Sequence, residues 1–283
     1  MKKILVPTDF SSCADKAITF AVESAKILSA EIILLHALDI QGSLYTDYMG
    51  VTKEYNQALQ NQFFHKLNSI KAIIQNTEGI KSDAIVSKNS LKNAMAEVAD
   101  GNDIDLIVMG TLGASGIKKV FFGSNTSSVI GNSKIPVLVI PPGYEWKKPE
   151  SFLFTTHHFE KDLKILDFIF EISNLYMARV NAAVFTNKEK DTAETLVKHT
   201  NQIPEYEKFI KRNYEEATFT TQHIFGKDFI ESLQNYITKN NVDILVMVTH
   251  KRDFLERIFN PGITRKMSYQ TKIPLLAIPA GED

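Results

Sequence analysis

Cysteine is nearly absent from this chain, and long apolar runs are absent altogether. The one cysteine, Cys13, excludes an intramolecular disulfide framework and a cysteine-rich zinc site. No apolar stretch approaches the roughly 18 residues that a transmembrane helix needs. The first strand is expected from Lys2, which leaves no room for a signal peptide. We therefore expect a protein of a reducing compartment, located in the cytoplasm.

Neither sign of charge dominates the sequence. The 32 lysine and arginine residues are balanced by 33 aspartate and glutamate residues, for a net charge of −1. This balance provides no basic surface in bulk for a nucleic acid, and no run of like charges suggests a solvating tail. The patterns G-x-x-x-x-G-K-[ST] and G-x-G-x-x-G are also missing, which excludes a P-loop and a dinucleotide-binding fingerprint.

Two segments of the first half recur in the second half. DIDLIVMGT at 103–111 recurs as NVDILVMVT at 241–249, and IPVLVIP at 135–141 recurs as IPLLAIP at 273–279. Both pairs are offset by 138 positions, since 241 − 103 and 273 − 135 both equal 138. Two separate matches at one offset indicate an internal repeat.

The start of the repeat has a different offset. The strand at 4–6 matches 152–154 at an offset of 148, so ten residues are lost between the second and third strands of the second copy. In the first copy this stretch holds a long polar segment at about 41–77. We expect a domain in each half of the chain, joined by the proline-rich linker 141–149. The expected domain bounds are 1–142 and 150–283.

Each copy alternates short apolar strands with helical patterns. The strands of the first copy are rich in β-branched residues and nearly continuous in apolar character, as in 4–6, 32–35, 104–109 and 137–140. Strands buried on both faces of a parallel sheet have this composition. Between the first two strands, apolar residues share one helical face, and Ser11 or Ser12 can cap that helix. The alternation predicts two tandem, open, doubly wound α/β domains.

Two loops at the carboxyl ends of the expected strands have an unusual composition. One is 7–9, PTD, and the other is 110–116, GTLGASG, which is followed by GSNT at 123–126 and a helix start near Ser124. In a doubly wound sheet the ligand crevice lies at this edge. Glycine lets backbone amides approach an anion, and a helix N-terminus adds free N–H groups and a positive dipole end. The loops therefore predict a phosphate site that needs no lysine.

Simpler interpretations of the same residues remain open. The segment 7–9 can be an ordinary strand end with an Asx-type turn, and the glycines can simply be residues of tight turns. Lys118 and Lys119 can approach phosphates, or they can form a solvated face. Cys13 is interpreted as a small buried helix residue in preference to a redox sensor.

The glycine spacing resembles that of a known family. Gly110, Gly113, Gly123 and Ser124 match the pattern G-2x-G-9x-G-[S/T] of the ATP-binding branch of the universal stress protein family. The segment KILVPTD at 3–9 is similar to the first strand of that family. The resemblance covers the whole chain, with one domain in each half. It implies that each domain is a five-stranded parallel sheet of order 3-2-1-4-5 with helices on both faces.

The resemblance also implies a ligand and an assembly. The first domain would bind ATP with Mg, with Asp9 on the ribose or a phosphate-bound metal and the backbone of Ala37 on adenine. The expected cofactor-binding residues are Pro7, Thr8, Asp9, Ala37, Met109, Gly110, Gly113, Gly123, Ser124, Asn125 and Thr126. Family members dimerise through their last strands, so 137–140 and 275–278 are expected to pair as an intrachain pseudo-dimer. A further homodimer of the chain is left open.

The second copy departs from the pattern at most binding positions. The alignment replaces Pro7, Asp9, Gly110, Gly113 and Gly123 by Thr155, His157, Val248, Lys251 and Pro261. A side chain at each former glycine obstructs the approach that the amides need, so this domain is expected to be degenerate. His157, His158 and His250 are expected near one edge, where surface histidines are favoured over a metal or anion site.

The sequence favours a nucleotide-binding regulatory protein of the stress response, with ATP hydrolysis slow at most. An adenylating enzyme would need a further catalytic domain or an S-G-G-x-D-S loop after the first strand, and neither is present. The alternative is an interaction or small-ligand-binding protein that takes no nucleotide. The ligand of the second domain, the partner protein and the stress stay open.

Overall fold

The computed structural model describes residues 1–38, 51–111, 123–156, 159–214, 218–249 and 272–280. These residues form two compact units, the first over Met1–Trp146 with Lys272 and the second over the described residues of Lys147–Lys251 and Ile273–Asp283, which include the last strand. The change from one unit to the next falls inside the stretch 141–149, where the sequence predicts a linker.

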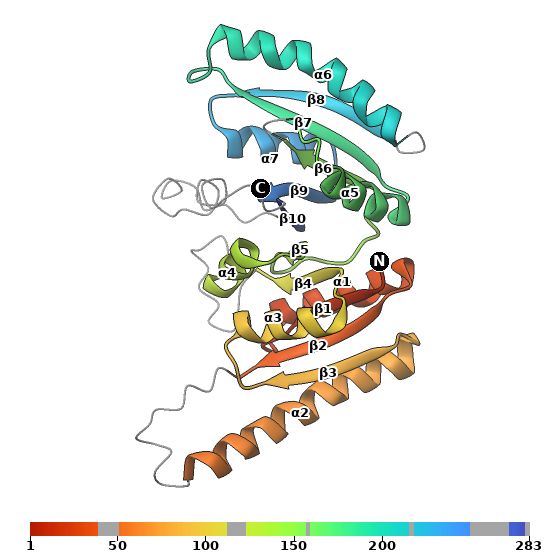
Figure 1. Ribbon diagram of the computed structural model, residues 1–283, viewed down its shortest axis with the longest axis vertical. Helices are drawn as coiled ribbons and strands as arrows, with labels where there is room; N and C mark the ends of the chain where they lie inside the picture. Colours follow the sequence, from red (N-terminus) through yellow and green to blue (C-terminus); the bar gives the residue numbers. More distant parts are fainter. Residues whose placement is uncertain (39–50, 112–122, 157–158, 215–217, 250–271, 281–283) are drawn as a thin grey trace. The chain divides into compact units, whose positions relative to one another are not determined.

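The first unit is a parallel sheet of five strands connected by helices (Figure 1). Its strands lie in the order β3-β2-β1-β4-β5, and every neighbouring pair is parallel. Its elements in chain order are β1 (Lys3–Pro7), α1 (Ser12–Leu28), β2 (Glu31–Ala37), α2 (Val51–Glu78), β3 (Ser82–Ser87), α3 (Leu91–Asn102), β4 (Leu106–Gly110), α4 (Ser124–Asn132) and β5 (Val137–Ile140).

The second unit repeats this arrangement. Its strands lie in the order β8-β7-β6-β9-β10 and are again parallel, so the predicted order 3-2-1-4-5 is confirmed in both units. The chain segment between β9 and β10, where the sequence predicts a fourth helix, lies outside the described residues. The described elements are β6 (Ser151–Thr155), α5 (Leu163–Tyr176), β7 (Arg179–Asn187), α6 (Ala193–Asn213), β8 (Phe219–Gly226), α7 (Phe229–Lys239), β9 (Ile244–Thr249) and β10 (Leu275–Pro279).

The first strand of each unit is buried on both faces. Ile4, Leu5 and Val6 of β1 have no exposed surface, and the same is true of Phe152 and Leu153 of β6. Burial of a large apolar side chain stabilises the fold by about 1.5–3 kcal/mol relative to its exposure. Continuous apolar strands therefore occupy the middle of each sheet, as their sequences predict.

Helix α1 begins where the sequence predicts. Ser11 is its N-cap residue, and the Ser11 side-chain oxygen accepts a hydrogen bond from the backbone N–H of Ala14 at 3.2 Å. Asp15 in the first turn and Lys26 in the last turn both complement the helix dipole. Because Ser11 comes directly after the loop that follows β1, this cap fixes the start of α1 beside the end of that strand.

Helix α2 occupies most of the segment that the sequence shows only as polar. It has 28 residues. Leu67 and Ile74, two helical turns apart, are buried, and most of its other described side chains are exposed. A narrow apolar stripe is enough to hold a helix against β3, because packing of one face provides most of a helix's stability. Despite this length, neither α2 nor any other helix within the described ranges could cross a membrane.

Candidate functional site

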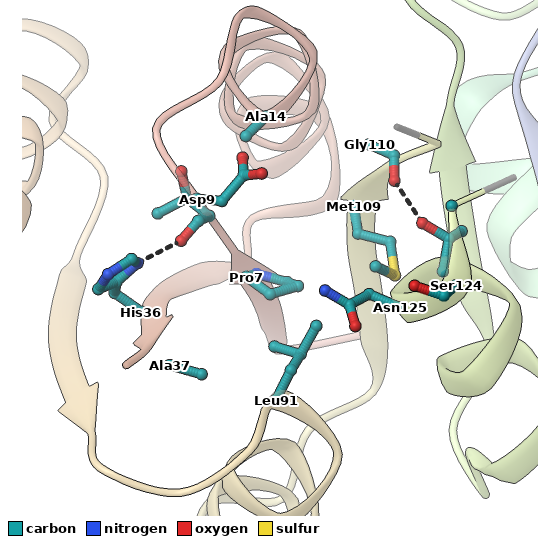
Figure 2. A pocket seen from close by; sticks show the side chains of 13 residues that line it. Pro7, Asp9, Ala14, His36, Ala37, Leu91, Met109, Gly110, Ser124 and Asn125 are labelled. Atoms are coloured by element: carbon teal, nitrogen blue, oxygen red, sulfur yellow. Dashed lines mark hydrogen bonds between the residues drawn. The ribbon is translucent and has the colours of Figure 1, made fainter. Parts of the chain in front are cut away.

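A pocket opens at the carboxyl ends of β1, β2 and β4, beside the start of α4 (Figure 2). Ten of the eleven predicted binding residues line it, and Gly113 lies outside the described residues. Three further lining residues, Ala14, His36 and Leu91, are absent from the sequence-based prediction. The predicted lining residues are Pro7, Thr8, Asp9, Ala37, Met109, Gly110, Gly123, Ser124, Asn125 and Thr126.

The turn after β1 holds Asp9 at the pocket. The Asp9 carboxylate accepts a hydrogen bond from the N–H of Ser11 at 3.1 Å, and the Thr8 hydroxyl accepts one from the N–H of Phe10 at 3.0 Å. Phe10 has a φ of 60°, a left-handed conformation that the two side-chain bonds help to stabilise. The loop is therefore an Asx-type turn, as the simpler interpretation has it, and the same turn also presents an exposed carboxylate to the pocket.

Gly110 allows β4 and α1 to approach closely. A Cβ atom at Gly110 would lie 2.8 Å from the sulfur of Cys13 and 3.0 Å from the Cys13 carbonyl oxygen. The contact with the sulfur is shorter than real Cβ atoms show and the contact with the carbonyl oxygen is among the tightest, so a side chain at this position would require Cys13 to shift. Cys13 is itself buried, as predicted. The position thus favours glycine for packing within the protein, in addition to any requirement from a ligand.

The other end of the glycine-rich segment is fixed by hydrogen bonds to β4. The N–H of Gly123 donates to the carbonyl of Thr111 at 2.8 Å, and the Thr126 hydroxyl donates to the carbonyl of Gly110 at 3.0 Å (Figure 2). The Gly123 amide is therefore used inside the protein. The backbone N–H groups that α4 offers to the pocket are those of its first turn, at Ser124, Asn125 and Thr126, since Gly123 has no side chain to cap them.

His36 is the principal residue that the sequence-based prediction missed. Its ring is buried, and its Nδ1 atom lies 2.7 Å from the carbonyl oxygen of Thr8. The ring packs against Phe10 and Phe63, with centroid distances of 4.8 and 4.3 Å, and the two phenylalanine rings also contact each other. Burial lowers the pKa of His36, and the charge of Lys66 acts in the same direction. A polar residue at the end of an otherwise apolar strand was the sequence signal that could have identified it.

The pocket carries little charge of its own. Asp9 is its one carboxylate among the described lining residues, and none of those residues is a lysine or an arginine. Lys118 and Lys119 lie outside the described residues, as do His157, His158 and His250. No group of three or more metal-ligating side chains occurs in the part of the chain that the structure describes.

The corresponding edge of the second unit is built differently. Val248 replaces Gly110 and is buried, and α5 begins at Leu163, whereas the offset of 148 places the counterpart of Ser12 at Glu160. The helix therefore starts three residues later (163 − 160) than its counterpart in the first unit. The replacements predicted at Lys251 and Pro261 lie outside the described residues.

A histidine pair contacts Thr186 of β7, with one histidine on α6 and the other within β8. The hydroxyl of Thr186 is 2.8 Å from Nδ1 of His199 on α6 and 2.7 Å from Nε2 of His223. A hydroxyl has one proton, so it can donate to one ring and must accept from the other. Burial lowers the pKa of His223, and the neighbouring His199 lowers it further. No pattern in the sequence indicates this pair, because its members come from separate elements of the chain.

Comparison with known proteins identifies relatives of this chain. A profile described as the universal stress protein family matches residues 1–141. The universal stress protein MJ0577 of Methanocaldococcus jannaschii is 31% identical over 153 residues, covering 49% of this chain and 94% of the relative. A second relative from that organism, MJ0531, is 30% identical over 149 residues, covering 53% of this chain and 84% of the relative.

Two solved structures match along the whole chain. A universal stress protein from Archaeoglobus fulgidus has a TM-score of 0.63 at 16% identity, covering 99% of this chain and 98% of the other. A second structure, described as a putative universal stress protein from Pseudomonas aeruginosa, has a TM-score of 0.60 at 12% identity, covering 99% of this chain and 93% of the other. At these identities the likeness concerns the fold, and it extends to the second unit.

Proposed function

Because the chain belongs to the universal stress protein family, we propose that its first unit binds an adenine nucleotide, ATP with Mg, and that its second unit binds none. The chain would act as a nucleotide-responsive regulatory protein of the stress response in the cytoplasm. One observation carries the proposal. The ends of three strands and the first turn of α4 bring ten of the predicted binding residues to one pocket.

The phosphate groups fit the side of the pocket formed by α4. The amides of Ser124, Asn125 and Thr126 begin a nine-residue helix, and the side chains of Ser124 and Asn125 add further donors. Amides at a helix N-terminus, together with the helix dipole, stabilise an anion without a lysine. The nucleotide would therefore be held by backbone groups whose positions depend on the bonds of Gly123 and Thr126 to β4.

The sugar and base fit the opposite side, formed by β1 and β2. Asp9 is exposed, so its carboxylate can accept hydrogen bonds from a ribose hydroxyl or from a water of a hydrated Mg²⁺. Pro7, Ala37 and Leu91 provide an apolar surface for a base. When bound, Mg²⁺ would neutralise phosphate charge that this pocket, with no described lysine or arginine, neutralises poorly.

Hydrolysis of the nucleotide is expected to be slow at most. Asp9 is the one described lining carboxylate, and its Oδ1 atom is engaged with the backbone of Ser11. A carboxylate in that role is better suited to binding than to removing a proton from water. If no nucleotide binds, the remaining candidate is an interaction or small-ligand protein with the same pocket.

Native mass spectrometry and calorimetry test the proposal. A gently purified sample is expected to contain one adenine nucleotide per chain, and titration of the stripped protein with Mg-ATP is expected to give a stoichiometry near one. Asp9→Ala should remove most of the binding heat, whereas Asp100→Ala, an exposed aspartate of α3, should leave it unchanged. A stoichiometry of two, or binding that survives in residues 150–283 alone, would refute the assignment to the first unit.

Pairing of the two last strands, expected from the family resemblance, stays a prediction. Residues 1–143 expressed alone should then form a homodimer in sedimentation experiments. A stable monomer would contradict this expectation and would leave the proposal on nucleotide binding unaffected.

A further inference from the structure

The side chain of His36 bonds to a carbonyl that the next backbone N–H of β2 would reach in a regular ladder. The pairing of β1 with β2 runs from Lys3↔Glu31 to Pro7↔Leu35, and the N–H of Thr8 continues it by donating to the carbonyl of Leu35 at 2.8 Å. In a regular parallel ladder the carbonyl of Thr8 would next accept the N–H of Ala37. Here Nδ1 of His36 lies 2.7 Å from that carbonyl oxygen (Figure 2).

The contact fixes the protonation of the ring. A carbonyl oxygen accepts hydrogen bonds and cannot donate one, so Nδ1 of His36 must carry the proton. The ring is 8% exposed and packed against Phe10 and Phe63, and burial lowers its pKa. His36 is therefore neutral at pH 7, with the proton on Nδ1 and a lone pair on Nε2.

The backbone of Ala37 faces away from β3. Pairing of β2 with β3 extends to Ala37↔Ser87, and the N–H of Leu38 donates to the carbonyl of Ser87 at 2.9 Å. Because successive residues of a strand direct their backbone groups to opposite neighbours, the N–H and C=O of Ala37 point toward β1. Strand pairing on that side ends at Pro7↔Leu35, and Ala37 lines the pocket there.

We infer that His36 is a positioning residue, which occupies the Thr8 carbonyl so that the N–H and C=O of Ala37 stay available to the edge of a bound purine. The part of this inference that concerns a purine rests on the proposed function. A purine with an amino group beside a ring nitrogen offers a donor and an acceptor side by side, which match the two backbone groups of one residue.

The second unit provides an internal comparison. The N–H of Thr156 donates to the carbonyl of Ala183 at 3.0 Å, which repeats the bond between Thr8 and Leu35 at an offset of 148. The counterpart of His36 is Val184, whose side chain has no donor. The pairing of β6 with β7 nevertheless ends at the same register, Thr155↔Ala183. The histidine bond is therefore confined to the first unit, and the fold does not require it.

Two variants of the full chain distinguish the effect of the aromatic ring from the effect of its N–H donor. His36→Phe keeps an aromatic ring against Phe10 and Phe63 but removes the N–H. His36→Asn loses the ring but places an amide N–H near the position of Nδ1. If the inference is correct, Ala37 pairs with Thr8 in His36→Phe, and its amide exchanges more slowly with solvent there than in the wild type. His36→Asn should keep the fast exchange of the wild type.

The measurements use ¹⁵N-labelled protein and do not require a ligand. In the wild type, the nitrogen resonances of His36 should show a protonated Nδ1 and an unprotonated Nε2. A proton on Nε2 would overturn the inference, and so would an Ala37 amide that exchanges equally fast in the wild type and in His36→Phe. Thermal unfolding of each variant identifies changes that come from a general loss of stability.

Titration with Mg-ATP tests the consequence for binding. His36→Phe is expected to weaken affinity about tenfold, the size of one lost hydrogen-bonding arrangement, and His36→Asn should stay within about threefold of the wild type. Equal loss in both variants would indicate that ring packing matters and would overturn the positioning role. If the wild type binds no adenine nucleotide, the proposed function fails, and the exchange data still decide whether His36 holds Ala37 open.

Discussion

Asp105 and Asp243, 138 positions apart (243 − 105), each accept two backbone hydrogen bonds from the start of a strand in their own unit. Asp105 accepts the N–H groups of Lys2 and Lys3 at 2.6 and 2.9 Å. Asp243 accepts those of Glu150 and Ser151 at 2.8 and 3.0 Å and also forms an ion pair with Lys147. The repeat therefore preserves a polar contact at the amino end of each sheet.

Removal of either aspartate should destabilise its unit. Asp243 is 5% exposed and Asp105 is half-buried, so we expect Asp243→Ala to lower the free energy of unfolding by about 2–3 kcal/mol and Asp105→Ala by about 1–2 kcal/mol. Urea denaturation followed by circular dichroism measures both effects. Asp100→Ala, at an exposed helical position of α3, is the control, and a larger effect there than at Asp105 would contradict the interpretation.

A side chain at Gly110 should disturb the protein even without a ligand. Gly110→Ala places a methyl group against the backbone of Cys13, and we expect a loss of about 1–3 kcal/mol in unfolding free energy. Cys13→Ala should restore part of this loss, because it removes the sulfur and leaves the carbonyl. Gly101→Ala in α3, where nothing lies within 4 Å of the new methyl group, should be neutral or stabilising by up to about 1 kcal/mol.

Nucleotide binding should depend on the glycine-rich segment and not on a lysine. Gly113→Lys, which copies the second unit, should abolish binding of Mg-ATP, whereas Lys118→Ala should weaken it less than about tenfold, because amides at a helix start hold phosphates without a lysine. Both positions lie outside the described residues, so this expectation comes from the sequence. Calorimetric titration compares the two variants, and greater damage from Lys118→Ala would exclude a backbone phosphate site.

The histidine pair should make the second unit sensitive to acid. The pKa of His223 is lowered by burial and by His199, so the unfolded chain binds its proton more readily than the folded chain does. The free energy of unfolding should therefore fall as the pH drops below about 6.5, the ordinary pKa of a histidine. Urea denaturation between pH 7.5 and 5.5 follows this loss.

A matched pair of variants assigns the acid sensitivity. His223→Gln keeps a polar group near the Thr186 hydroxyl and does not titrate, so it should reduce the pH dependence. His65→Gln, at an exposed position of α2, should leave that dependence as it is in the wild type. The same slope in the wild type and in His223→Gln would show that the pair is not responsible.

The fold could be predicted because its signals are local and repeated. Continuous apolar strands such as 4–6, their alternation with amphipathic helices, and the serine that caps α1 all appear within short windows of sequence. The second copy then supplied an independent check through its offset of 138. The position and length of α2 could not be predicted, because only two of its described side chains, Leu67 and Ile74, are buried and distinguish it from a polar loop.

The candidate site was predicted less completely. Spacing drew attention to Gly110 and Gly123, but spacing cannot show that one packs against Cys13 or that the amide of the other is already bonded to Thr111. His36 was missed because its role depends on the register of β1 against β2. Register joins residues that are far apart in sequence, and a single sequence carries no record of it.

The bonds that join Gly123 and Thr126 to the end of β4 have a consequence for how this protein can change. Thr111 directly follows β4 and Gly123 directly precedes α4, and the two are joined by a backbone hydrogen bond. The two ends of the eleven-residue segment between them (123 − 111 − 1) are therefore held together. Doubling the length of a tethered segment costs only about 0.6 kcal/mol in closure entropy. Insertions and substitutions there can accumulate without moving the helix, and descendants of this gene could acquire new ligand preferences while their architecture stays intact.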